Sequence, residues 1–244
     1  MESVTKIPFF KEISGDLETP LSIYLKFMDD RNSYLFESVE GGEKWARYSI
    51  IGLPTDKKID LSKNPLKDIE NFLKQNKAQS IPDLPDFHGG LVGYFSYETI
   101  RHIEKKLQNS SKEKLPYPDI SLMVSDEVVI YDNLKKSLFI VVHGNEDTKK
   151  ECHERIELIH KKILEPLPSQ KSSKKGVINF ESSVKKEDYL EAIKKIKNYI
   201  VEGDVMQVVY GQEFSTKFEG SPIDLYRSLR KLNPSPYMLS LIHI

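Results

Sequence analysis

The sequence predicts an α+β protein in which antiparallel hairpins alternate with amphipathic helices. Residues 34–52 and residues 120–143 each contain two runs rich in β-branched and aromatic residues, separated by turn-forming residues. Residues 149–164 and residues 186–202 instead repeat apolar side chains at helical spacing. Hairpins interleaved with helices are typical of antiparallel sheets that helices cover.

The composition is that of a globular protein without a polyanionic partner. Over 244 residues, 39% are hydrophobic and 30% are charged, which fits one or two folded domains. The net charge of −1 favours neither nucleic acid nor an anionic membrane surface as a partner. We see no signal peptide and no apolar run long enough for a membrane span. A single cysteine excludes an internal disulfide framework and favours a reducing, cytoplasmic setting.

The clearest helix covers residues 149–164. Cys152, Ile156, Ile159 and Ile163 form one apolar stripe along it. Two histidines, His153 and His160, lie beside this stripe and together with Cys152 could suggest a metal site. Their spacing is not the i, i+4 spacing of helical metal ligands and no second cysteine exists, so we interpret them as part of a solvated face.

The hairpin of residues 34–52 carries more polar chemistry than a strand pair needs. Glu37, Ser38 and Arg47 lie within otherwise apolar runs, and Gly41-Gly42 is expected to form the turn. Buried polar groups must find partners or bind a ligand. One interpretation is an internal contact between Glu37 and Arg47, and the other is a ligand site.

The glycine-rich stretch of residues 88–98 is predicted to be a buried strand. It lacks the Gly-Lys-Ser/Thr of a phosphate loop, and its glycine spacing does not match a dinucleotide turn. Glycine within a strand instead permits another backbone to approach closely.

Local signals predict the remaining elements. Helices are expected at 21–28, from Asn64 and Pro65 onward, at 186–202 and at 222–232. The helix at 186–202 should turn Tyr189, Ile193, Ile196 and Ile200 inward and end at Gly203. Single strands are expected at 120–131 and 204–214, and the strand before Gly52 and Pro54 should end there.

Two motifs resemble those of the anthranilate synthase component I family, which uses chorismate. LFES at 35–38, followed by GGEKWARYSIIG at 41–52, is similar to the family's N-terminal signature. NPSPYM at 233–238 is similar to a second signature, and residues 186–232 resemble the opening of its chorismate-binding domain. Many members have Ser-Gln-Arg where this chain has Gly211-Gln212-Glu213, so we assign that strand no role. The resemblance implies a layered sandwich of antiparallel sheets flanked by helices, here truncated.

In this family the two motifs form opposite walls of a pocket for L-tryptophan, the feedback inhibitor. The resemblance therefore implies inhibitor-binding roles for Ser38, Pro236, Tyr237 and Met238, with Glu37 and Tyr48 as further candidates. Tyrosine offers an aromatic wall for an indole, methionine adapts to it, and a proline-rich loop exposes carbonyl oxygens that suit an ammonium group. The alternative is a proline-rich loop that only leads into a strand. A ligand held by both motifs would couple inhibition to the packing of the two parts.

The resemblance also implies an activity for the whole enzyme. Chorismate and ammonia, which a partner glutamine amidotransferase (component II) releases from glutamine, would give anthranilate and pyruvate for tryptophan biosynthesis. Mg²⁺, the chorismate ligands and the catalytic groups of the family lie beyond Pro-Tyr-Met. We therefore expect no catalytic and no metal-binding residue in residues 1–244, and no activity of this chain alone.

The chain is expected to consist of four parts. Residues 1–165 match the N-terminal regulatory region, residues 166–180 are rich in Pro, Ser and Lys and form a linker, and residues 181–238 begin the chorismate-binding domain. The last six residues, Leu239 to Ile244, resemble a translated sequencing adapter, which predicts a non-native tail. The alternative is a genuine strand, since the segment is apolar enough to pair.

Two other functions remain open at the level of sequence. The chain could belong to aminodeoxychorismate synthase component I of the folate pathway, although the intact Glu-Ser and Asn-Pro-Ser-Pro-Tyr-Met motifs argue against it. It could also be an amino-acid-binding module without catalysis. Tryptophan binding by the short chain, with a natural stop codon after Met238, would favour the module.

Overall fold

The computed structural model describes residues 6–29, 31–39, 47–107, 117–169 and 179–242. The chain forms two compact units. The first unit contains residues 1–169 and 228–244, and the second contains residues 170–227. Among the described helices, none has both the length and the apolar character that crossing a membrane requires.

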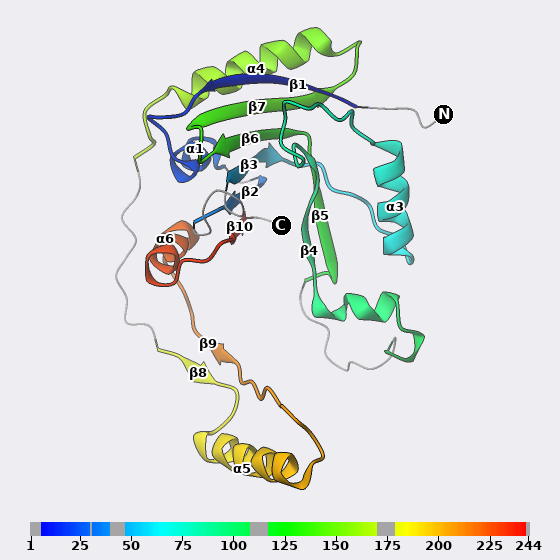
Figure 1. The fold of residues 1–244 in the computed structure, drawn as a ribbon, viewed down its shortest axis with the longest axis vertical. Helices are drawn as coiled ribbons and strands as arrows, with labels where there is room; N and C mark the ends of the chain where they lie inside the picture. The colour runs from blue at the N-terminus through cyan, green and yellow to red at the C-terminus, as the bar shows by residue number, and fades with distance from the viewer. Residues whose placement is uncertain (1–5, 30, 40–46, 108–116, 170–178, 243–244) are drawn as a thin grey trace. The chain divides into compact units, whose positions relative to one another are not determined.

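An antiparallel sheet dominates the first unit (Figure 1). Within the described residues it has six strands in the order β1-β7-β6-β3-β2-β10. Their bounds are β1 Ile7–Ser14, β2 Asn32–Glu37, β3 Tyr48–Thr55, β6 Glu127–Asp132, β7 Ser137–Gly144 and β10 Met238–Ile242. The predicted hairpin of residues 120–143 is confirmed for β6 and β7, which pair in register from Glu127 to Asp132.

One face of this sheet packs against a second antiparallel pair, β4 Gly90–Phe95 and β5 Ile120–Ser125. The buried side chains between them come from both layers and from the loop before β4, which contributes Leu84; the others are Tyr34, Val92, Met123, Val128, Ile130, Phe139 and Val141. The hydroxyl groups of Tyr34 and Ser125 meet at 2.9 Å and join the layers by a hydrogen bond. The glycine-rich stretch forms the predicted strand, β4, but the predicted burial was wrong, since only Val92 of this strand is buried and Phe95 is 52% exposed.

Two helices cover the opposite face, α1 Pro20–Phe27 and α4 Lys149–Ile163 (Figure 1). The predicted stripe of α4 is confirmed, since Cys152, Ile156, Ile159 and Ile163 are all buried. The thiol of Cys152 is among the groups whose pKa burial raises. Two packed antiparallel sheets with helices outside form the α+β sandwich that the family resemblance implies.

Ile156 offers a test of this helix–sheet packing. We expect Ile156→Val to lower the free energy of unfolding by about 1 kcal/mol, because a methyl-sized void opens beneath a side chain that is 2% exposed. Ile103→Val is the matched control, since Ile103 is 59% exposed and should change stability by only a few tenths of a kcal/mol. Urea unfolding of both variants measures the two effects, and equal losses would contradict this packing.

The other elements are shorter or lie in the second unit. In the first unit these are α3 Pro65–Gln75 and the 3₁₀ helices Tyr97–His102 and Lys105–Leu107. In the second unit they are α5 Lys186–Glu202 and the strands β8 Glu181–Ser182 and β9 Phe214–Ser215, which pair with each other. Helix α6, Pro222–Leu232, begins in the second unit and ends in the first. Gly203 ends α5 with φ at 83°, as its position predicts.

Two strand predictions in the first unit were wrong in detail. Strand β3 does not stop at Gly52 and Pro54 but continues to Thr55, because Gly52 lies directly opposite Tyr34 and the missing side chain leaves room for that ring. The run of residues 120–131 is two strands, since β5 pairs with β4 while β6 stays in the main sheet. The break falls at Asp126, whose carboxylate binds Lys6 and Lys57.

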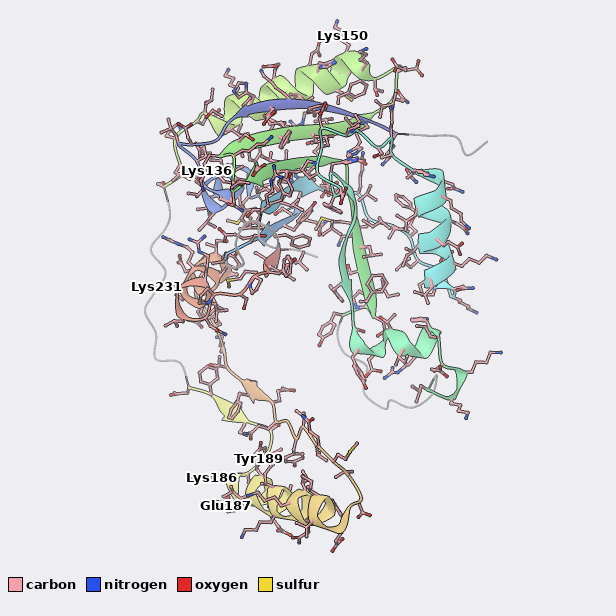
Figure 2. The ribbon with its side chains drawn as sticks, in the orientation of Figure 1. Lys136, Lys150, Lys186, Glu187, Tyr189 and Lys231 are labelled. Atoms are coloured by element: carbon pink, nitrogen blue, oxygen red, sulfur yellow. The ribbon has the colours of Figure 1, made fainter. Side chains whose placement is uncertain are left out.

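The strand predicted at residues 204–214 was also wrong. Only its last residue is in a strand, and residues 204–213 have no ladder partner among the described residues. Its apolar side chains therefore stay outside, with Met206 at 99% and Val209 at 87% exposure. Helix α5, on which Figure 2 labels Tyr189, likewise buries none of the inward residues predicted for it, although the rings of Tyr189 and Tyr210 lie 5.0 Å apart.

Some predictions fall outside the described residues or remain predictions. The Gly41-Gly42 turn and residues 170–178 of the predicted linker are outside them. Of the six residues predicted to be a non-native tail, Leu239 to Ile242 lie in β10, and their origin stays a prediction. The limits of the predicted regions likewise stay predictions.

Candidate functional site

The two motifs singled out in the sequence lie side by side at one edge of the main sheet. Strand β10 pairs antiparallel with β2, with Met238 opposite Glu37 and Leu239 opposite Phe36. The end of LFES and the end of NPSPYM therefore meet, although about two hundred residues separate them along the chain. This pairing brings the predicted residues of both motifs into one neighbourhood.

Ser38 is held in a fixed orientation at the end of β2. Its backbone N–H donates to Ser49 Oγ at 3.1 Å, and its own hydroxyl donates to the carbonyl oxygen of Tyr48 at 2.8 Å. Ser49 is fully buried and also accepts a bond from Asn133 Nδ2 at 3.1 Å. Because the Ser38 proton is committed to Tyr48, the hydroxyl can still accept hydrogen bonds from a ligand.

Glu37 is buried and binds Arg230, an arginine that lies just before the NPSPYM motif in the chain. Nη1 of Arg230, on α6, donates to Glu37 Oε1 at 2.6 Å. The predicted internal contact between Glu37 and Arg47 was therefore wrong. Arg47 donates through Nε and Nη2 to Asp132 Oδ2, at 3.0 and 2.7 Å, because the strand pairing sets Tyr48 opposite Asp132.

The remaining predicted residues differ in exposure. The ring of Tyr48 is partly buried beneath the guanidinium of Arg47, whose Cζ lies 4.8 Å from the ring centroid. Burial raises the pKa of Tyr48, and the Arg47 charge offsets part of that rise. Tyr237 is 65% exposed, Pro236 is also exposed, and Met238 is partly buried. The aromatic ring of Tyr237 is thus open to solvent, and Tyr237 directly precedes Met238, which pairs with Glu37.

Together these groups suit a small ligand with an apolar ring and a charged head group. They offer oxygen acceptors at Ser38 and Glu37, an aromatic face at Tyr237 and a guanidinium at Arg230. Sequence reasoning missed Arg230, because a basic residue in the last turn of a helix is ordinary and nothing local indicates its partner. The described residues contain no cluster of three or more His, Cys, Asp or Glu side chains that could hold a metal ion.

Comparison with known proteins identifies similarity over nearly the whole chain. The family model described as chorismate binding enzyme matches residues 31–243. The anthranilate synthase component 1 of Pseudomonas aeruginosa is 41% identical, over 97% of this chain and 54% of that protein. The enzyme of the same name from Acinetobacter calcoaceticus is 40% identical, over 95% of this chain and 52% of that protein. The chain thus spans about half the length of these curated relatives.

Two solved structures share the fold. Anthranilate synthase component I from Streptococcus pneumoniae superimposes with a TM-score of 0.64 at 21% identity, covering 91% of this chain and 52% of that one. MenF, the menaquinone-specific isochorismate synthase from Escherichia coli, gives a TM-score of 0.55 at 12% identity, covering 98% of this chain and 48% of that one. At these identities the likeness concerns the fold.

Proposed function

The chain belongs to the chorismate binding enzymes, and on that premise we propose that it is the inhibitor-binding part of an anthranilate synthase component I. In this proposal, L-tryptophan binds between the end of β2 and the start of β10. Ser38, Pro236, Tyr237 and Met238 contact the ligand, and Glu37 and Tyr48 complete the site. The relatives reported above are anthranilate synthases, which favours this pathway over folate synthesis.

The pairing of β2 with β10 is the observation that supports this proposal most strongly. It sets Glu37 opposite Met238, so residues from both motifs can touch one small molecule. Tyr237 leaves an aromatic ring exposed for the indole, and Ser38 keeps acceptor capacity for an ammonium group. The site lies within the first unit alone, so this chain can be tested for tryptophan binding directly.

For the whole enzyme we propose the lyase reaction that converts chorismate and ammonia to anthranilate and pyruvate in the cytoplasm. Component II would supply the ammonia from glutamine, and tryptophan would inhibit the reaction. We assign chorismate, Mg²⁺ and catalysis to the part of the longer relatives that this chain does not match. The part of the chain that the structure describes contains no group of three or more His, Cys, Asp or Glu side chains that could hold Mg²⁺.

Substitution of Ser38 tests the proposed inhibitor site. We expect Ser38→Ala to weaken L-tryptophan binding roughly tenfold or more, because a hydrogen bond to the ligand's ammonium group and the bond that orients Ser38 on Tyr48 are both lost. Isothermal titration calorimetry with the 244-residue chain measures the dissociation constant.

Ser137→Ala is the matched control. The Ser137 hydroxyl is buried without a hydrogen-bond partner in the described part of the chain, so its removal should leave affinity unchanged. Ser38→Ala binding L-tryptophan as tightly as the parent chain would remove Ser38 from the site. If the parent chain itself does not bind L-tryptophan, the inhibitor-binding function is wrong.

A further inference from the structure

The ion pair between Glu37 and Arg230 joins the two sides of the proposed tryptophan site. The Glu37 side chain is only 7% exposed, whereas that of Arg230 is 34% exposed. Glu37 directly precedes Ser38 in the chain, and its partner in the sheet, Met238, directly follows Tyr237. The basic member of the ion pair is therefore open to a molecule bound at this site, while its acidic member is largely enclosed.

The guanidinium of Arg230 has more N–H groups than its bond to Glu37 uses. A guanidinium carries five N–H groups in a planar fork that matches a carboxylate. Across the described residues, Arg230 uses one of them, from Nη1 to Glu37. A second carboxylate can therefore bind the same guanidinium without displacing Glu37.

The other arginine near the site is less free to bind a ligand. Arg47 directs both Nε and Nη2 to Asp132, whose carboxylate is fully buried. Turning Arg47 toward a ligand would leave that buried charge without its cation, which is costly. Its guanidinium also stacks on the ring of Tyr48. Arg230 is thus the better-placed cation.

An amino acid at this site needs partners for two opposite charges. Glu37 is an acceptor and the Ser38 proton is committed to Tyr48, so both suit the ammonium group and neither offers a donor to the carboxylate. We propose that Arg230 binds the α-carboxylate of the amino acid, so that the Glu37–Arg230 pair selects a zwitterion. This inference rests on the proposed function and deepens it, because it names the group that distinguishes an amino acid from other indoles.

The proposal predicts how the ligand's charges matter. Tryptamine keeps the indole and the ammonium group but has no carboxylate, so it should bind the parent chain more weakly than L-tryptophan does. Indole-3-propionate keeps the carboxylate but has no ammonium group, and should bind weakly for the opposite reason. Only L-tryptophan satisfies both members of the pair.

The test is a set of calorimetric titrations of the 244-residue chain and its variants with these three compounds. We expect Arg230→Gln to weaken L-tryptophan binding roughly tenfold or more and to leave tryptamine binding unchanged or stronger. Arg230→Lys should recover part of the loss, because it restores the charge without the fork. Lys231→Gln is the control, since Lys231 is exposed on the same helix turn (Figure 2) and should not alter binding.

Two outcomes would overturn the inference. Equal weakening of L-tryptophan and tryptamine in Arg230→Gln would mean that Arg230 only holds Glu37 in place. Unchanged L-tryptophan binding in that variant would mean that Arg230 does not contact the ligand. If Arg230→Gln does not fold, the double variant Glu37→Gln with Arg230→Gln removes the buried charge as well and takes its place, with the same expected loss of preference for L-tryptophan over tryptamine.

The same titrations separate this inference from the proposed function. If the parent chain binds L-tryptophan and only the Arg230 results differ from expectation, the inference alone is wrong. If the parent chain does not bind L-tryptophan, the proposed inhibitor-binding function is wrong, and the role of Arg230 is wrong with it.

Discussion

Gly52→Ala is expected to lower the free energy of unfolding by about 3 kcal/mol or more. An added Cβ would lie 1.8 Å from Cε1 of Tyr34, far inside contact distance. The ring has nowhere to move, because Tyr34 is fully buried and its hydroxyl is hydrogen-bonded to Ser125. The clash must therefore be relieved by separating β2 from β3 or by expelling the ring from between the two sheets. Urea or thermal unfolding followed by circular dichroism measures the loss.

Gly211→Ala is the control for this prediction. A Cβ at Gly211 meets nothing within 4 Å, so the variant should match the parent chain in stability. A second variant identifies the cause: in the Gly52→Ala background, Tyr34→Leu should cost less than it does alone, because the smaller side chain removes the clash. Strict additivity of the two losses would show that Tyr34 is not what excludes a side chain at Gly52.

Asp132→Ala is expected to be of similar severity, with a loss of about 3 kcal/mol or more at neutral pH. Asp132 is fully buried at the β6–β7 turn. One carboxylate oxygen accepts from Arg47, and the other accepts from the backbone N–H groups of Leu134 and Lys135. Asp132→Asn should lose less, because an amide oxygen can keep the two turn bonds. Asp147→Asn, at an exposed acid, should change stability little.

Asp132→Ala should also make the stability of the fold less sensitive to acid. Burial alone would raise the pKa of Asp132, but the bonds from Arg47 and the two backbone amides outweigh it and lower that pKa below its ordinary value of 3.8. A carboxyl with a lowered pKa in the folded state stabilises fully above its unfolded pKa, and this contribution disappears as the pH falls through the folded pKa. The stability difference between the parent chain and Asp132→Ala should therefore shrink as the pH falls from 5 toward 2, which urea midpoints across that range would show. A constant difference would contradict the role of the Asp132 charge.

Sequence periodicity predicted the helices well, because the signals that begin and end a helix are local. The bounds of α5 and α6 and the buried stripe of α4 follow from such signals. The limits of the strands were predicted less accurately, because where a strand ends depends on the strands that pair with it. Gly52 is a usual strand terminator, yet β3 passes through it since the ring of Tyr34 covers it. The apolar run 204–214 has strand composition, but no described strand pairs with residues 204–213.

Of the candidate site, only the residues that belong to the two sequence motifs could be predicted. Ser38 and Tyr237 were singled out because they belong to family signatures, and β2 and β10 do bring those signatures together. The partners of the charged groups could not be predicted. Glu37 and Arg47 are ten positions apart in one hairpin and invite pairing, but Glu37 binds Arg230 and Arg47 binds Asp132. Such choices depend on tertiary neighbours that no local pattern encodes.

The position of β10 beside β2 has a consequence for protein synthesis. Strand β2 leaves the ribosome early and gains β3 as a neighbour soon afterwards, but its other edge stays open until β10 is made about two hundred residues later. At roughly 5–20 residues per second, that interval lasts about 10–40 s. Throughout it, the nascent chain presents the unpaired backbone of an aromatic, apolar strand, which is a surface on which other chains can pair. We therefore expect nascent chains to depend on chaperone protection of β2 during this interval.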